Sequence, residues 1–369
     1  MAGKGKATPP HTQVWPVDDV EADQASIKRA AALLRAGKLV AFPTETVYGL
    51  GADATNAEAV ASIFAAKERP LSDPVIVHLA DAADLAGVAS AVPPSAEQLA
   101  ARFWPGPLTL VLPRAPRIPP IVAAGGDTIG VRVPGHAVAR ALIRAAGVPV
   151  AAPSANRFMH TSPTTAAHVL ADLDGRIAGV LDAGPCAVGV ESTVLDVTTD
   201  PPRLLRPGGI SLEALRAVLP GVVYQESLPG GAPEQPPPNT LPARAPGQME
   251  LHYAPRARLI VFAGTGPAAE EAVAAEVAAA LAAGERVGAL VADEEAAALA
   301  AAGALVAALG PRADLQEAAR RLYAGLRALD GAGADRIVAH AFGEDGLGLA
   351  LNDRLRRAAG GQLRPLPTP

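Results

Sequence analysis

The chain has 369 residues and a formal net charge of −5, so it is long enough for two domains but lacks the positive charge of proteins that cover nucleic acid or an anionic membrane. Any phosphate group must therefore be bound by a local cluster of cations. The single cysteine, Cys186, excludes an intramolecular disulfide and a multi-cysteine zinc site, and we expect a reducing, cytoplasmic location.

Residues 1–22 are predicted to form a disordered tail, because the chain starts with Gly, Lys, Thr and Pro and shows no apolar periodicity. The first ten residues also lack the apolar stretch of a secretory signal. A helical pattern then covers residues 23–36, and Gly37 is placed to end it. A buried strand at 39–42 and a polar turn at 43–46 should follow.

Residues 23–222 are predicted to form an α/β domain. Asn56 can cap a helix whose apolar residues recur at helical spacing and which Pro70 ends. Further strands are expected at 75–79, 108–112, 129–133, 148–152, around 181, at 193–197 and at 204–205. Helices at 95–103 and 137–146 separate some of these strands, which favours a mixed sheet.

Residues 223–256 are predicted to be a linker, because the composition changes to Pro, Gly and small polar residues. Residues 257–369 should form a small parallel α/β domain, since strands alternate there with Ala-rich helices. Its strands are expected at 259–262, 287–291 and 337–339, and its helices near 267–283 and 314–329. The longest uncharged apolar run, 296–311, is shorter than the roughly 20 residues of a membrane-spanning helix.

Nucleotide sites that can be recognised by spacing are absent from the sequence. There is no G-x-x-x-x-G-K-[ST] loop, and the G-x-G pairs at 264–266 and 346–348 lack the third glycine of a dinucleotide site, so we interpret them as turns. Polar residues at the ends of apolar strands are more informative, because open α/β sheets present ligands there. Four such segments are 43–51, 67–70, 152–156 and 189–193.

Two of these segments contain residue pairs suited to phosphate. Lys67 and Arg69 are two cations in three residues, and an extended exit from the helix would point both the same way. They could bind an oligophosphate or simply form a solvated helix end. Ser154 and Asn156 follow an apolar strand and could orient phosphate oxygens or a ribose, or could serve only as a cap or turn.

Arginines inside or at the end of apolar strands need anionic partners. For Arg132 the partner is either an internal carboxylate, such as Asp127 or a glutamate, or the carboxylate of a ligand, and the same alternatives hold for Arg206. His252 and Tyr253 lie in the polar linker, where two rings imply docking onto a domain.

Taken in order along the chain, these segments resemble the threonylcarbamoyl-AMP synthase family in its two-domain form. The segments that carry the resemblance are 41–54, the K-x-R at 67–69, 103–109, the S-x-N at 154–156, 162–164, 191–193, 205–208 and 252–255. The resemblance implies a YrdC-like twisted mixed sheet with helices, then the linker and a small Rossmann-like parallel α/β domain. It implies that L-threonine, bicarbonate and ATP are joined into threonylcarbamoyl-AMP with release of pyrophosphate, a nucleotidyl transfer that begins threonylcarbamoyladenosine formation in tRNA.

The resemblance also implies the roles of individual residues. The nucleotide-phosphate tetrad with catalytic roles would be Lys67, Arg69, Ser154 and Asn156. The remaining ATP contacts would be Asp73, Thr128, Ser162, Arg206, His252 and Tyr253, the last two on a linker that closes as a lid. Threonine would contact Thr46, His78, Arg132, Ala152 and Ser192.

Mg²⁺ is expected to enter with ATP, and we assign no metal ligand among the side chains. Asp73 stands where relatives often carry a neutral Asn, so a carboxylate near the phosphates needs a cation to balance it. The product would pass to a tRNA threonylcarbamoyltransferase. An RNA-binding module and a nucleotide-binding regulator without chemistry are the alternative functions, and the acidic charge balance disfavours the first.

Overall fold

A mixed β-sheet forms the centre of the N-terminal part of the chain in the computed structural model, which describes residues 11–224 and 252–367. Within those residues the strand order is β1-β8-β2-β3-β7-β4-β6-β5-β9-β10. The strands are β1 (Gln13–Pro16), β2 (Val40–Phe42), β3 (Gly49–Asp53), β4 (Val77–His78), β5 (Leu108–Pro113), β6 (Thr128–Arg132), β7 (Val150–Ala151), β8 (Gly179–Asp182), β9 (Thr193–Asp196) and β10 (Arg203–Arg206). Parallel and antiparallel pairs alternate irregularly along this sheet, as the sequence predicted.

Helices cover both faces of this sheet. They are α1 (Gln24–Arg35), α2 (Ala57–Lys67), α3 (Pro94–Phe103), α4 (Ala137–Ala146), α5 (Ala166–Leu173) and α6 (Leu212–Val218), with 3-10 turns η1 (Ala82–Gly87) and η2 (Pro120–Ala123). Strand β2 illustrates the alternation that makes two cores: Ala41 packs with the core that includes α2 and α3, whereas Val40 and Phe42 pack with α1 and α4.

The N-terminal segment corrects one prediction. Residues 1–22 were expected to be a disordered tail, but Gln13–Pro16 forms β1 and pairs in parallel with β8 at the edge of the sheet. The backbone N–H of Val17 extends the pairing by donating to Asp182. Trp15 and Val17 are buried and supply the apolar side that holds the strand. Residues 1–10 lie outside the described part of the chain.

Helix α2 ends differently from the prediction. Asn56 does cap it, because its Oδ1 accepts hydrogen bonds from the backbone N–H groups of Glu58 and Ala59. The chain does not leave in an extended conformation, however. Lys67 is the last helical residue and Glu68 takes a left-handed conformation with φ of 56°. This turn buries Lys67 and Arg69 and leaves Glu68 at the surface.

The C-terminal part contains a separate sheet whose strands are all parallel, as predicted, and the structure gives their order as β11-β14-β12-β13. Its elements are β11 (Arg258–Phe262), α7 (Pro267–Ala282), β12 (Val287–Val291), α8 (Asp293–Ala301), β13 (Leu305–Ala308), α9 (Leu315–Gly331), β14 (Arg336–His340) and α10 (Gly348–Ala358). Ile260 packs toward α7 and α8, whereas Leu259 and Val261 pack toward α9 and α10. Helices lie on both faces, which confirms the predicted small α/β unit.

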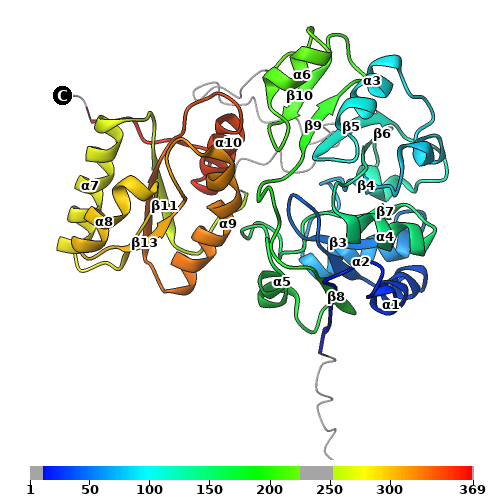
Figure 1. The fold of residues 1–369 in the computed structure, drawn as a ribbon, viewed down its shortest axis with the longest axis horizontal. Coiled ribbons are helices and arrows are strands. Elements are labelled where there is room, and N and C mark those ends of the chain that lie inside the picture. Colours follow the sequence, from blue (N-terminus) through cyan, green and yellow to red (C-terminus); the bar gives the residue numbers. More distant parts are fainter. Residues whose placement is uncertain (1–10, 225–251, 368–369) are drawn as a thin grey trace, which may run out of the picture.

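Helices α9 and α10 face the N-terminal part of the chain (Figure 1). The core between them includes Val47 and Val190 from the N-terminal part together with Leu322 of α9. Gly189, with φ of +80°, permits the close approach, because a Cβ there would lie 2.4 Å from the carbonyl oxygen of Ala319. Among the helices of the described residues, none has the length and apolar character needed to cross a membrane.

Candidate functional site

A cavity of about 50 Å³ lies where several strands of the large sheet end. Most of the segments singled out in the sequence meet there, since the loops after β2 and β7, the start of β9 and the ends of β4, β6 and β10 converge. The lining residues are Thr44, Thr46, Val47, Gly49, Arg69, Ile76, His78, Arg132, Ala152, Pro153, Ser154, Glu191, Ser192, Arg206, His252 and Tyr253. All five residues predicted to contact threonine and five of those predicted to contact ATP are among them.

Lys67 is buried against the S-x-N segment beside this cavity. Its Nζ donates to the carbonyl oxygens of Ser154 and Asn156, each at 2.5 Å. Burial, together with the positive charge of Arg69, lowers the pKa of Lys67 well below its ordinary value. The alternative of a solvated helix end is therefore wrong: the structure places the amine in a dry site, where an added anion would strongly favour its charged form.

Arg69 lies next to Lys67 and is paired with Asp73. The Nη2 atom of Arg69 is 2.9 Å from Asp73 Oδ2 and donates to the carbonyl oxygen of Pro74 at 2.6 Å. Burial raises the pKa of Asp73 although Arg69 and Lys67 oppose that shift. The cation that this carboxylate was expected to need is thus Arg69 itself.

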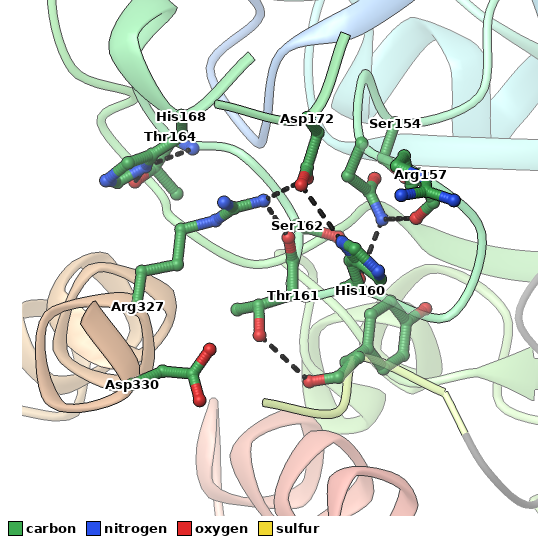
Figure 2. Close-up of polar contacts among 12 residues, drawn as sticks. Ser154, Arg157, His160, Thr161, Ser162, Thr164, His168, Asp172, Arg327 and Asp330 are labelled. Carbon is green, nitrogen blue, oxygen red and sulfur yellow. Dashed lines mark hydrogen bonds and ion pairs between the residues drawn. The ribbon is translucent and has the colours of Figure 1, made fainter. Parts of the chain in front are cut away.

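Asn156 combines a turn role with an unused acceptor. Its Nδ2 donates to the carbonyl oxygens of Arg157 and His160 at 2.8 and 2.7 Å, so the turn interpretation holds for this amide nitrogen. Its buried Oδ1 has no hydrogen-bond partner among the described residues. Ser162 follows in the same segment, and its Oγ donates to Glu191 at 2.6 Å. Figure 2 shows how this segment lies between its neighbours.

Arg132, at the end of β6, finds an internal glutamate. Its Nη2 is 2.6 Å from Glu45 Oε1, its Nη1 donates to Thr46 Oγ1 at 3.0 Å and its Nε donates to the carbonyl oxygen of Gly106 at 3.1 Å. Burial raises the pKa of Glu45, but the charge of Arg132 and hydrogen bonds from Arg132 and the backbone together outweigh burial, and the net shift is downward. The pair is therefore charged, and Asp127 is not the partner.

Ser192 and Arg206 also line the cavity. Ser192 Oγ shares a hydrogen bond of 2.8 Å with Thr109, and the carbonyl oxygen of Ser192 accepts from Arg206 Nη2 at 3.0 Å.

His78, at the end of β4, is also buried at the cavity. Burial, followed by the charge of Arg132, lowers its pKa to about 3. It is thus a neutral imidazole at physiological pH.

His252 and Tyr253 dock onto both parts of the chain, which agrees with the anchoring that two rings in a linker implied. Tyr253 is buried, with its ring 5.7 Å from that of Tyr323, and its carbonyl oxygen accepts from Thr161 Oγ1 at 3.3 Å. The ring of His252 is 6.1 Å from that of Phe158. Both side chains also line the cavity. Residues 225–251 of the predicted linker lie outside the described part of the chain.

The structure separates one predicted residue from the others. Thr128 begins β6, whose far end carries Arg132, so about 13 Å of strand lies between them. Thr128 is not among the cavity's lining residues, because the strand direction puts it at the opposite edge. Lys67, Asp73 and Ser162 lie just behind the lining, because they bond to Ser154, Arg69 and Glu191, which form it. Asn156 is connected to the lining through Lys67.

Sequence reasoning assigned no role to the polar residues Thr44, Glu45 and Glu191. All three stand inside segments that were singled out, but spacing gave no signal for their partners.

Cys186 is buried, and burial raises the pKa of its thiol to about 12. A thiol so rarely ionised is a poor nucleophile, in line with an inert structural role.

The buried histidines predict an acid-sensitive fold. Burial lowers the pKa values of His78 and His252 to about 3, so below pH 6.5 the unfolded chain binds protons that the folded chain does not. The free energy of unfolding should fall by about 1 kcal/mol per histidine between pH 7 and 5.5. Burial also lowers the pKa of His168 to about 4, which adds to the fall. His340 acts in the opposite direction: despite burial, a hydrogen bond to Glu295 raises its pKa. This shift partly offsets the fall in the free energy of unfolding.

Urea unfolding at pH 7 and 5.5 measures this effect. The His78→Asn/His252→Asn variant should show a smaller decrease than the wild-type protein. Equal unfolding free energies of the wild type at the two pH values would contradict the prediction.

Comparisons with known proteins cover most of the chain. A family model described as telomere recombination matches residues 32–208, and one described as threonylcarbamoyl-AMP synthase, C-terminal domain, matches residues 210–360. The threonylcarbamoyl-AMP synthase of Bacillus subtilis is 44% identical over 356 residues, which are 95% of this chain and 99% of that protein. That of Pyrococcus abyssi is 42% identical over 338 residues, 92% of this chain and 95% of that protein.

A solved structure gives the same result for the fold. The structure described as P. abyssi Sua5 complexed with L-threonine has a TM-score of 0.86 and 40% sequence identity to this chain, and the match covers 96% of this chain and 99% of that chain. Both the large mixed sheet and the small parallel sheet therefore have counterparts in one solved protein.

Proposed function

The chain belongs to the threonylcarbamoyl-AMP synthase family, and we propose that it is a nucleotidyltransferase that joins L-threonine, bicarbonate and ATP into threonylcarbamoyl-AMP. The observation that best supports this proposal is that two separate cationic sites lie at the same cavity. Lys67 and Arg69 form a buried cationic end suited to phosphates, and Arg132 forms a second cationic end suited to an amino-acid carboxylate.

The chemistry follows from this arrangement. The threonine amine and bicarbonate condense to a carbamate with loss of water, and a carbamate oxygen attacks the α-phosphorus of ATP. The bond from that phosphorus to the β-phosphate oxygen breaks, and pyrophosphate leaves. The carbamate is a weak, short-lived nucleophile, so the enzyme's task is to hold it in line and exclude water.

Charge on the departing pyrophosphate is the main electrostatic demand on the protein. Arg69 lines the cavity and Lys67 lies just behind it, and together they supply fixed positive charge there once an anion enters. Arg206 and the unused Oδ1 acceptor of Asn156 are placed to orient the nucleotide. No covalent enzyme intermediate is needed, which agrees with the inert thiol of Cys186.

Mg²⁺ is proposed to arrive with ATP, where it would neutralise phosphate charge. Such ions usually bind through one or two carboxylates together with substrate phosphates. Within residues 11–224 and 252–367, no three His, Cys, Asp or Glu side chains cluster in a way that could hold a metal alone. Asp73, a buried carboxylate whose Oδ2 lies 2.9 Å from Arg69 Nη2 beside the proposed phosphate site, is the side chain that would contact the ion.

Binding of ATP requires the cavity to open, because about 50 Å³ is far too small for a nucleotide. His252 and Tyr253 line the cavity at the start of the described C-terminal residues. We propose that they move with the linker as a lid that closes over the bound nucleotide. The labile product would then pass to a tRNA threonylcarbamoyltransferase in the cytoplasm.

The test is to incubate the purified protein with ATP, Mg²⁺, bicarbonate and L-threonine, and to measure pyrophosphate together with threonylcarbamoyl-AMP by mass spectrometry. We expect both products in equal amounts, and their loss when threonine or bicarbonate is omitted. Pyrophosphate release that ignores threonine would overturn the proposal. Tight RNA binding with a steep salt dependence, in a protein that makes no product, would favour the RNA-binding alternative.

A further inference from the structure

The carboxylate of Glu191 joins the two parts of the chain at the edge of the cavity. Its Oε1 accepts the hydrogen bond from Ser162 Oγ at 2.6 Å. Its Oε2 accepts from the Tyr323 hydroxyl of α9 at 2.8 Å and from Arg354 Nε of α10 at 2.7 Å. Ser162, Tyr323 and Arg354 are at most 1% exposed. One dry carboxylate therefore fixes a predicted ATP contact to two C-terminal helices.

Arg354 reaches two further segments of the same cavity wall. Its Nη2 donates to the carbonyl oxygen of Pro207 at 2.9 Å, directly after Arg206. Its Cζ lies 5.3 Å from the centre of the Tyr253 ring. A single guanidinium of the C-terminal part thus touches Glu191, the chain next to Arg206 and the segment that we propose as a lid.

The charges in this cluster depend on one another. Burial alone would raise the pKa of Glu191, but Arg354 and Arg206 outweigh it and hold that pKa at about 2. Arg354 also pairs with Asp353 at 2.5 Å. Because an unpaired buried charge is costly, withdrawing Arg354 would leave Glu191 to rearrange toward other cations or to take up a proton. Either change would disturb its bond with Ser162.

A second contact holds the Ser162 segment from the side of α5 and α9. Arg327 of α9 donates to Asp172 Oδ2 at 2.7 Å and to the carbonyl oxygen of Thr161, and Asp172 Oδ1 is 2.9 Å from His160 Nδ1. Figure 2 shows Arg327, Asp172, His160 and Thr161 meeting in this way. The segment from Asn156 to Ser162 is therefore connected to the C-terminal part at two points, directly through Arg327 and indirectly through Glu191.

We propose that Glu191 is a positioning residue through which α9 and α10 set the places of Ser162 and of the Arg206–Pro207 peptide for ATP. The C-terminal part is then a component of the nucleotide site, even though its own side chains do not contact the substrate. This inference rests on the proposed function. It predicts an effect on ATP that exceeds the effect on threonine. Of the predicted threonine contacts only Ser192 adjoins Glu191, whereas Arg132 bonds to Glu45 and Thr46.

The experiment compares Arg354→Met, Glu191→Gln and the double variant. Arg354→Met should raise the KM for ATP at least tenfold and change the KM for threonine less than twofold. In the double variant, the neutral amide still accepts the bond from Ser162 and no buried carboxylate is left unpaired. Its kcat/KM for ATP should therefore be at least threefold higher than that of Arg354→Met alone, a rescue that a merely structural role would not give.

Arg336→Met is the matched control. It removes a largely buried arginine with two carboxylate partners, Glu276 and Glu285, each at 2.5 Å inside the C-terminal part. It should lower the melting temperature as Arg354→Met does, yet leave kcat and both KM values within twofold of the wild type. If Arg354→Met does not fold, Arg354→Lys keeps the charge but loses the multiple contacts and should show the same selective rise in the KM for ATP.

Amide hydrogen exchange over residues 157–164 tests whether this segment is held in place, and the measurement does not depend on catalytic activity. Faster exchange in the Arg354 variant than in Arg336→Met supports the proposal, and equal exchange overturns it. Similar changes in both KM values, or no rescue in the double variant, would also overturn it. A wild-type protein that makes no threonylcarbamoyl-AMP would instead refute the proposed function, and the exchange comparison would still decide the role of Glu191.

Discussion

Replacing Lys67 with methionine is expected to lower kcat/KM for ATP by about 10³-fold or more while the protein stays folded. The amine of Lys67 is buried between the carbonyl oxygens of Ser154 and Asn156, beside the Arg69–Asp73 pair. An incoming triphosphate would meet this amine in a water-poor site, where a positive charge stabilises developing negative charge more strongly than in water. Methionine fills similar space but supplies neither charge nor donor.

Glu68→Gln provides the matched control, because this neighbouring side chain points to the surface and pairs with Arg157 and Arg176. Exposed pairs of this kind contribute little to stability, so its kcat/KM should stay within twofold of the wild type. Steady-state kinetics with a melting curve for each variant makes the comparison. Wild-type turnover in a folded Lys67→Met protein would show that the phosphate site lies elsewhere.

Lys67 also illustrates what could be predicted from the sequence alone and what could not. Two cations in three residues at the end of a helix could be recognised, but not whether they were solvated. The decision depends on the left-handed conformation of Glu68, which turns Lys67 and Arg69 inward. A single conformation at one non-glycine residue has no dependable pattern in the sequence. The pair was therefore predicted correctly as a candidate, while its burial became visible only in the structure.

Two of the strands that were not predicted, β3 and β13, share a physical cause. Strand β3 consists of Gly, Leu, Gly, Ala and Asp, with few of the β-branched and aromatic residues that mark strands. Strand β13 lies within an Ala-rich stretch, where small side chains give no clear period. Both strands form because neighbouring strands pair with them. Tertiary context outweighs local preference in these cases, and a single sequence does not contain that context explicitly.

The sequence also did not show which residues far apart in the chain pair with each other. The sequence indicated that Arg132 needs an anion but left Asp127, a glutamate and a ligand carboxylate as alternatives. The structure gives Glu45. The contact between Glu191 and Arg354 spans 163 positions, and no spacing rule connects residues so distant. Local chemistry thus predicted which residues matter, whereas the pairing among them depended on how the two sheets pack.

Replacing Arg132 with methionine is expected to raise the KM for L-threonine about 100-fold, because a charge-assisted hydrogen bond contributes about 1.5–3 kcal/mol and a guanidinium can make two to a carboxylate. The same change should destabilise the protein by about 3 kcal/mol, since it leaves Glu45 as an unpaired carboxylate in a largely buried place. A loss of threonine binding alone would therefore be ambiguous between a missing contact and a damaged fold.

The double variant Arg132→Met/Glu45→Gln separates the two explanations. It removes the unpaired charge together with the arginine, so the free energy of unfolding in urea should return most of the way to the wild-type value. The KM for threonine should remain about 100-fold raised, because no cation is left to bind the carboxylate, while the KM for ATP should change little since Lys67 and Arg69 are intact. Recovery of the threonine KM along with stability would mean that Arg132 acts only as the structural partner of Glu45, and that another residue of the cavity binds the amino acid.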